Sequence, residues 1–193
     1  MTIQSRGKRL IRPLVLGLAL SIAPVATAAS TSPASATVCE SSWGSLTKQR
    51  APHTGKQITD VRSGRHACFD RLVISLNGDG RGSPGYYVKY VRHVTKDGSG
   101  QRVPLRGRAN IAIVINAPAH QPDGDPTYEP AHLRELVDVD GYQTFRQVAW
   151  AGDFEGQTII GLGVRARLPM RVFVLRETSD GSYRVVVDVA HRW

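Results

Sequence analysis

Apolar and polar residues alternate in short runs from residue 57 to the end of the chain. In one of these runs Leu72, Ile74 and Leu76 fall on one face, with polar or smaller residues between them. A period of two residues is typical of a strand with one buried face, and Gly, Pro, Asn and Asp bound the runs. The pattern predicts eight or nine short strands, with candidates at residues 57–62, 69–76, 86–94, 102–106, 109–116, 143–150, 157–166, 170–176 and 183–189.

Turn-forming segments separate these runs. Residues 179–182 (SDGS) join two alternating runs and are typical of a hairpin turn. Residues 117–135 hold four prolines and are predicted to form one long loop, ending in a helical turn near residues 131–136. Long loops in compact domains are often functional. Short strands joined by hairpin turns indicate an antiparallel sandwich or barrel.

The first 28 residues have the features of a secretory signal peptide. Four basic residues precede an apolar run that ends at an Ala-x-Ala site, residues 26–28, and a second such site follows at 34–36. The apolar run is short and is interrupted by Gly17 and Pro24, which argues against a membrane span, although a retained anchor stays the alternative. We expect cleavage after one of the two sites, secretion, and no transmembrane segment in the mature chain.

The next segment is predicted to divide into a leader and an arm. Small and polar residues fill positions 29–38, which leaves nothing to bury and predicts disorder. Residues 39–54 include Trp43 and Leu46 and are expected to form an extended or short helical arm. One domain over residues 55–193 follows, because this length suits a single core.

The net charge of the chain narrows the choice of partner. Four of the nine excess positive charges precede residue 28, which leaves +5 for the mature chain. Most of this excess is arginine, spread along the sequence without a block of like charges or interleaved aromatic residues. Nucleic acid is therefore not expected as a partner. A solvated surface and affinity for anionic wall polymers or lipid headgroups both remain open.

A histidine, a cysteine and an aspartate lie close together at His66, Cys68 and Asp70. The chain has two cysteines, and in an oxidising compartment an even count predicts a disulfide between Cys39 and Cys68. Such a disulfide contributes roughly 3–4 kcal/mol in the loop-entropy description. The competing hypothesis is a thiolate nucleophile beside His66, since alternate residues of a strand share a face. A secreted thiol is a liability, which favours the disulfide.

Sequence motifs for catalysis or metal binding are absent. The segment 81–85 fails the G-x-S-x-G pattern, H-E-x-x-H does not occur, and the six histidines are scattered. The acidic residues between 123 and 140 match no standard calcium loop. We therefore predict no catalytic residue, no metal and no cofactor.

Five segments in a characteristic order carry a resemblance to a known family. They are GRHACFDRLVISL at 64–76, PGYYVKYV at 84–91, DGSGQRVPLRGRANIAIVI at 97–115, AGDFEGQTIIGLGVRARLPMRVFVL at 151–175 and RVVVDVAH at 184–191. Together they resemble the AMIN-like domain proteins secreted by actinobacteria, over roughly residues 55 to 191. The resemblance implies a mainly β fold, an antiparallel β-sandwich. It also implies a non-catalytic role in binding peptidoglycan or another component of the envelope.

Three functional hypotheses follow. The first is a secreted, monomeric, non-enzymatic domain that binds a wall polymer such as peptidoglycan. Its candidate ligand contacts are the loop 117–135 and the side chains of Tyr86, Tyr87, Tyr90 and Arg92. Packing within the sheet is the alternative role for the tyrosines. The second hypothesis is a secreted enzyme with a site near His66, Asp70 and His93. The third is an adaptor or inhibitor that binds an envelope protein through an apolar patch or an edge strand.

Overall fold

The computed structural model describes Cys39 and residues 41–193, so the predicted signal peptide (1–28) and leader (29–38) lie outside the described residues. Within the described residues the chain forms strands and no helix. The strands are β1 (Lys48–Arg50), β2 (Gln57–Arg65), β3 (Phe69–Asn77), β4 (Tyr86–Val91), β5 (Val94–Thr95), β6 (Arg102–Val103), β7 (Ala109–Ile115), β8 (Phe145–Phe154), β9 (Gln157–Val164), β10 (Met170–Arg176) and β11 (Tyr183–Ala190).

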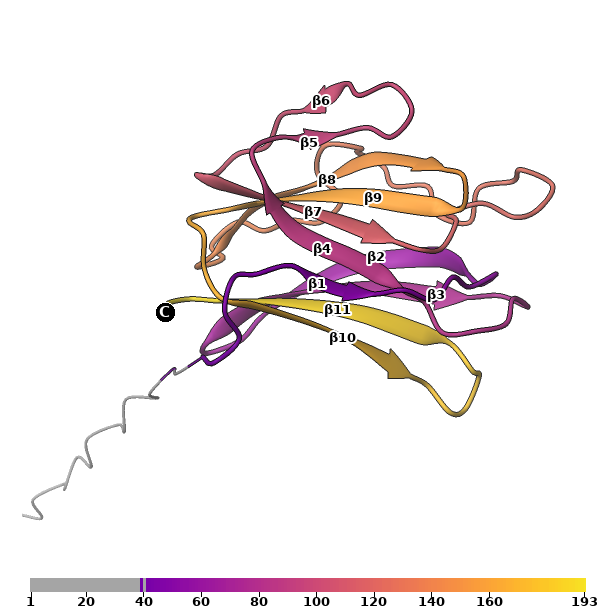
Figure 1. Cartoon of the computed structure of the whole chain (residues 1–193), viewed down its shortest axis with the longest axis horizontal. Helices are drawn as coiled ribbons and strands as arrows, with labels where there is room; N and C mark the ends of the chain where they lie inside the picture. Colours follow the sequence, from indigo (N-terminus) through magenta and orange to yellow (C-terminus); the bar gives the residue numbers. More distant parts are fainter. Residues whose placement is uncertain (1–38, 40) are drawn as a thin grey trace, which may run out of the picture. The chain divides into compact units, whose positions relative to one another are not determined.

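The strands form two main sheets that face each other (Figure 1). The five-stranded sheet has the order β1-β4-β7-β9-β8, and the four-stranded sheet has the order β10-β11-β3-β2. Every pairing is antiparallel. The predicted antiparallel β-sandwich is therefore confirmed.

The core lies between the two sheets. Leu72, Ile74 and Leu76 point into it with no exposed surface, as the alternation predicts. From the five-stranded sheet, Ile111 and Ile113 of β7 meet them. Full burial of one such side chain contributes roughly 1.5–3 kcal/mol, so this alternation of apolar residues drives the pairing of the two layers.

Two predicted strands are divided or cut short in the structure, two others end one or two residues earlier than predicted, and one strand was not predicted. The segment 86–94 divides into β4 and β5 at an exposed turn formed by Arg92 and His93. The segment 102–106 has only two strand residues, because Pro104 lacks the N–H that strand pairing needs. Strand β1 lies in the arm and pairs with β4.

The helical turn predicted near residues 131–136 is wrong. The only hydrogen bond that closes a turn between described residues there runs from the N–H of Glu135 to the carbonyl of His132. The N–H of Leu136 instead donates to the carbonyl of Val148, on the edge of β8. A helix would need that N–H for its own ladder, so pairing with the sheet edge prevents one.

The β5–β6 hairpin packs on the outer face of the five-stranded sheet and forms a second small core (Figure 1). Its buried residues are Val94, Val103, Ala149 and Ala151. The chain after β6 then lies directly on β9: a Cβ added at Gly163 would stand 2.0 Å from the carbonyl oxygen of Arg106. Glycine is required at this position because a side chain would displace that segment.

The disulfide joins the arm to the start of β3. Cys39 pairs with Cys68 with their Cα atoms 5.2 Å apart, so the predicted pairing is present. Beyond it, the N–H of Met170 donates to the carbonyl of Gly44 at 2.8 Å, and the guanidinium of Arg171 lies 4.2 Å from the ring centroid of Trp43. The arm is therefore attached to the edge of the four-stranded sheet at several points.

Candidate functional site

The structure separates the candidate tyrosines. Tyr86 and Tyr90 point between the sheets, where their hydroxyls donate to the carbonyls of Val172 (3.0 Å) and Leu168 (2.8 Å). Burial raises the pKa of both phenols above the usual value. Tyr87 points outward and is exposed, with the ammonium of Lys89 4.8 Å from its ring centroid. Tyr86 and Tyr87 line one hollow and Tyr90 lines another, so the three tyrosines do not share one surface.

The residues of the enzyme hypothesis have three different environments. The exposed His66 stacks on Phe69 with ring centroids 4.4 Å apart, and His93 is exposed in the turn after β4. Asp70 is fully buried. No hydrogen bond between described residues links any two of these three side chains.

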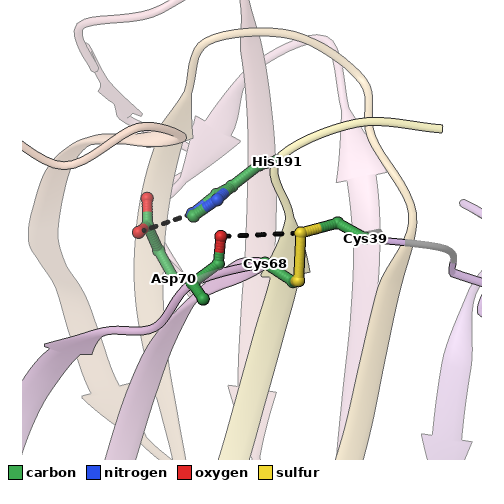
Figure 2. Close-up of a disulfide and its surroundings, with 5 residues drawn as sticks. Cys39, Cys68, Asp70 and His191 are labelled. Atoms are coloured by element: carbon green, nitrogen blue, oxygen red, sulfur yellow. Dashed lines mark hydrogen bonds and ion pairs between the residues drawn. A yellow bond between two sulfur atoms is a disulfide. The ribbon is translucent and has the colours of Figure 1, made fainter. Parts of the chain in front are cut away.

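Asp70 instead joins three segments at one end of the sandwich through hydrogen bonds. Its carboxylate accepts hydrogen bonds from the N–H groups of Thr144 (2.6 Å) and Phe145 (3.0 Å). Its other oxygen lies 3.0 Å from Nε2 of His191, and this pair is next to the disulfide (Figure 2). These contacts come from β3, from the start of β8 and from the C-terminal residues. The carboxylate is thus bound on both oxygens, as burial of a charge requires.

The long loop 117–135 is held at both sides of the sandwich. Asp153 accepts from the N–H of Ala119 (2.8 Å) and lies 2.7 Å from Nδ1 of His120. The hydroxyl of Thr127 donates to the carbonyl of Ile58 at 2.7 Å, which covers the edge of β2. Residues 121–126 between these anchors are exposed.

A group of arginines that the sequence analysis did not bring together lies at one end of the five-stranded sheet. We call it the cationic end: Arg92, Arg108, Arg146, Arg165 and Arg167. Two shallow hollows, of about 440 and 370 Å³, are lined by these side chains, and Arg108 borders both. Four of the five are exposed and Arg146 is half-buried.

The strand register brings these arginines to the same end. Ala109 of β7 pairs with Val164 of β9, so Arg108 and Arg165 continue the same ladder beyond the two strands. The N–H of Arg108 donates to the carbonyl of Val164 at 2.9 Å. Gly107 makes this close approach possible, because its φ is +117° and a Cβ there would lie 2.5 Å from that same carbonyl oxygen.

The positive charges of the cationic end are not neutralised by the described part of the chain. None of its five guanidinium groups lies within ion-pair distance of a carboxylate of the described residues. Arg165 donates to the carbonyls of Gln143 (3.2 Å) and His191 (2.5 Å), and Arg167 donates to the backbone and hydroxyl of Ser45. Neutral acceptors fix the position of these side chains and leave their charge available to an anion.

The adjacent Arg106 has a different environment. Its guanidinium forms a two-point ion pair with Glu135, which raises its pKa. The fully buried Gln147 supports this pair, since its amide carbonyl accepts from the N–H of Arg106 at 2.7 Å and its amide N–H₂ group donates to Glu135 at 3.2 Å. Arg106 is therefore not counted in the cationic end, because Glu135 neutralises its charge, whereas Arg108 has no such partner among the described residues.

A sequence signal for the cationic end exists. Arg106 and Arg108 precede one predicted strand, and Arg165 and Arg167 close another, each pair in an R-x-R spacing. If those two strands are antiparallel neighbours, the two pairs must meet. These arginines do not form a continuous block of like charge in the sequence, so the charge pattern alone does not predict the cluster. Of the predicted contacts, Arg92 and Tyr90 line this surface.

The fold and this surface define a β-sandwich domain that presents a cluster of free guanidinium groups at one end. The family model of the AMIN-like domain matches residues 56–191, so the chain belongs to the AMIN-like domain family. AMIN-like domains are associated with the cell envelope, and the disulfide fits an extracellular protein. No curated protein and no solved structure matches this chain. Secretion and an actinobacterial origin stay predictions.

Among the described residues, no three His, Cys, Asp or Glu side chains are arranged to hold a metal ion. Cys39 and residues 41–193 form no helix that is long and apolar enough to cross a membrane.

Proposed function

We propose that this chain is a secreted, non-catalytic domain of the cell envelope that binds an anionic wall polymer, with peptidoglycan as the leading candidate, through the cationic end. The observation that carries the proposal is the set of five neighbouring arginines with no carboxylate partner among the described residues. Membership of an envelope-associated family supports the choice of polymer.

The chemistry of arginine supports a carboxylate or phosphate ligand. A guanidinium group presents a planar set of N–H donors that matches either group at two points, and its charge persists at any physiological pH. Stem peptides of peptidoglycan carry free carboxylates, and other wall polymers carry phosphates. Several cations around two adjoining hollows raise the local concentration of such anions.

The shape of the site suits a long chain better than a small molecule. Both hollows are shallow, and they adjoin at Arg108. Small-molecule sites bury most of their ligand, whereas a repeating polymer gains affinity from several weak contacts along a surface. Tyr90 supports this surface from the inside, because Arg167 lies 5.1 Å from its ring centroid.

The experiment is co-sedimentation of the purified protein with insoluble peptidoglycan. The test variant is Arg92→Ala with Arg108→Ala, since both side chains are exposed and neither forms a hydrogen bond with a described residue. The matched control is Arg81→Ala with Arg176→Ala, two exposed arginines outside the cationic end. We expect the test variant to bind about tenfold more weakly and the control to bind like the parent chain, because charge-assisted contacts are lost only in the first. Equal retention of both variants would contradict the proposal.

A further inference from the structure

The β5–β6 hairpin forms a second concave surface, separate from the cationic end. A groove of about 540 Å³ lies between the hairpin and residues 133–134, beside the edge of β8. Its apolar lining consists of Val103, Pro104, Leu133 and Trp150. We call it the Trp150 groove.

The apolar lining of this groove is held in place by the backbone. The N–H of Trp150 donates to the carbonyl of Leu133 at 2.7 Å, so the two lining residues are tied together. The indole packs against Tyr128 with ring centroids 5.7 Å apart. Leu133 keeps 57% of its surface exposed, so its side chain offers an accessible aliphatic surface beside the indole.

Three cations surround this lining: Lys96, Arg102 and Arg134. All three are exposed, and none forms an ion pair with a carboxylate of the described residues. Arg134 is oriented by a hydrogen bond from Nη2 to the carbonyl of Pro104 at 3.1 Å. The groove therefore combines an indole and aliphatic surface with a positively charged rim.

We propose that the Trp150 groove binds an acidic saccharide. The C–H face of a pyranose ring carries partial positive charge and packs on the electron-rich face of an indole. A carboxylate on the same ring pairs with the cations of the rim. An inorganic anion would leave the apolar lining exposed, and a purely apolar ligand would leave the cations without a partner. An acidic sugar satisfies both parts of the groove.

The Trp150 groove uses other residues and another chemistry than the cationic end, and so it adds a second site to the proposed function. The cationic end recognises negative charge in any polymer, whereas the Trp150 groove discriminates by the sugar ring. The two sites are tested independently, since no lining residue of this groove belongs to the cationic end.

The experiment is calorimetric titration of the full chain with tetragalacturonate, an acidic oligosaccharide. Chitotetraose supplies sugar rings without carboxylates, and hexaglutamate supplies carboxylates without rings. We expect tetragalacturonate to bind at least about tenfold more tightly than either comparison ligand, because only it engages both the indole and the rim.

Two variants locate the site. Arg102→Ala with Arg134→Ala removes exposed cations and is expected to weaken binding of tetragalacturonate by about tenfold, while Arg92→Ala with Arg108→Ala leaves it unchanged. Trp150→Phe keeps an aromatic ring in the core and is expected to weaken binding by a smaller factor; circular dichroism checks that it folds. The proposal is overturned if tetragalacturonate does not bind, if hexaglutamate binds as tightly, or if only the variant of the cationic end loses binding.

Discussion

Arginine side chains gather in two regions of this domain, one with a carboxylate partner and one without a carboxylate partner among the described residues. On the outer face of the four-stranded sheet, Arg71 and Arg171 both bind the carboxylate of Asp188, at 2.7–2.9 Å. Asp188 has no exposed surface, and its hydrogen bonds raise the pKa of Arg71. Arg171 is also stacked on Trp43. At the cationic end, by contrast, none of the five arginines has a carboxylate partner among the described residues.

The comparison shows how one residue type serves two purposes in one fold. Around Asp188 one buried carboxylate pairs with both guanidinium groups and the aromatic rings cover their aliphatic parts, so these arginines stabilise the arm and the sheet. At the cationic end neutral acceptors hold three of the guanidinium groups, the other two form no hydrogen bond with a described residue, and the charge of all five stays available. We therefore expect substitutions in the first region to change stability and substitutions in the second to change binding.

The disulfide is expected to have the largest effect, because it holds the arm that supplies Trp43 to the first region and Ser45 to the second. Cys39→Ser with Cys68→Ser opens a loop closed over a sequence separation of 29 residues. We expect the free energy of unfolding to fall by about 3–4 kcal/mol in urea denaturation, from the entropy of the unfolded chain. A loss below about 1 kcal/mol would show that the other contacts of the arm suffice.

Removal of Asp188 is expected to have the next largest effect. Asp188→Asn keeps the shape of the side chain but leaves Arg71 and Arg171 without their counter-charge. The loss of unfolding free energy is expected to be about 2–3 kcal/mol, since a buried charged hydrogen-bond network is broken. Urea denaturation measures it, with Asp79→Asn as the matched control at an exposed carboxylate. If both variants unfold at the same urea concentration, the structural role of Asp188 is wrong.

Tyr90 links the inner layer to the cationic end. Its hydroxyl donates to the carbonyl of Leu168 at 2.8 Å and accepts from the N–H of the same residue at 2.9 Å. Tyr90→Phe leaves both backbone groups without this partner and is expected to cost about 1–2 kcal/mol of stability. Tyr87→Phe is the matched control, because its hydroxyl binds no described residue and its ring is exposed. Equal melting temperatures for the two variants would contradict this role.

Alkaline pH is expected to produce the smallest effect. Burial, and secondarily the charge of Asp60, raises the pKa of Tyr128 from 10.0 to about 12. Above pH 10 the unfolded state therefore loses this proton before the folded state does, so stability falls as the pH rises from 10 towards 12. Because the side chain is half-exposed, screening limits its share to about 1 kcal/mol. Urea denaturation at pH 9 and pH 11.5 measures the loss, and Tyr128→Phe should reduce it; an identical loss in that variant would exclude this residue as the cause.

Much of the fold could be predicted because its signals are local. The alternation in residues 69–76 and 170–176 sets which side chains face the core, and the structure confirms those strands. The division of the segment 86–94 was missed, because Arg92 and His93 carry no Gly or Pro to mark their turn. The helical turn near residues 131–136 was wrong because a distant strand edge takes the N–H of Leu136.

The candidate site was less predictable, since it depends on which strands are neighbours. Tyr86 and Tyr90 share a face with the core, and strand periodicity alone cannot say which face of an isolated run is buried. The arginines of the cationic end are separated by up to 75 positions in the sequence, from Arg92 to Arg167. Only the pairing of β4, β7, β9 and β8 brings them to one end.

The central claim is that charge without a carboxylate partner, rather than arginine content, marks the binding surface. The most direct measurement is the dissociation constant for peptidoglycan of two variants, Arg92→Ala with Arg108→Ala and Asp188→Asn, at a temperature where both are folded. The first variant is predicted to bind about tenfold more weakly with unchanged stability, and the second to bind like the parent chain despite its lower stability. Weaker binding by the Asp188 variant together with full binding by the arginine variant would contradict the claim.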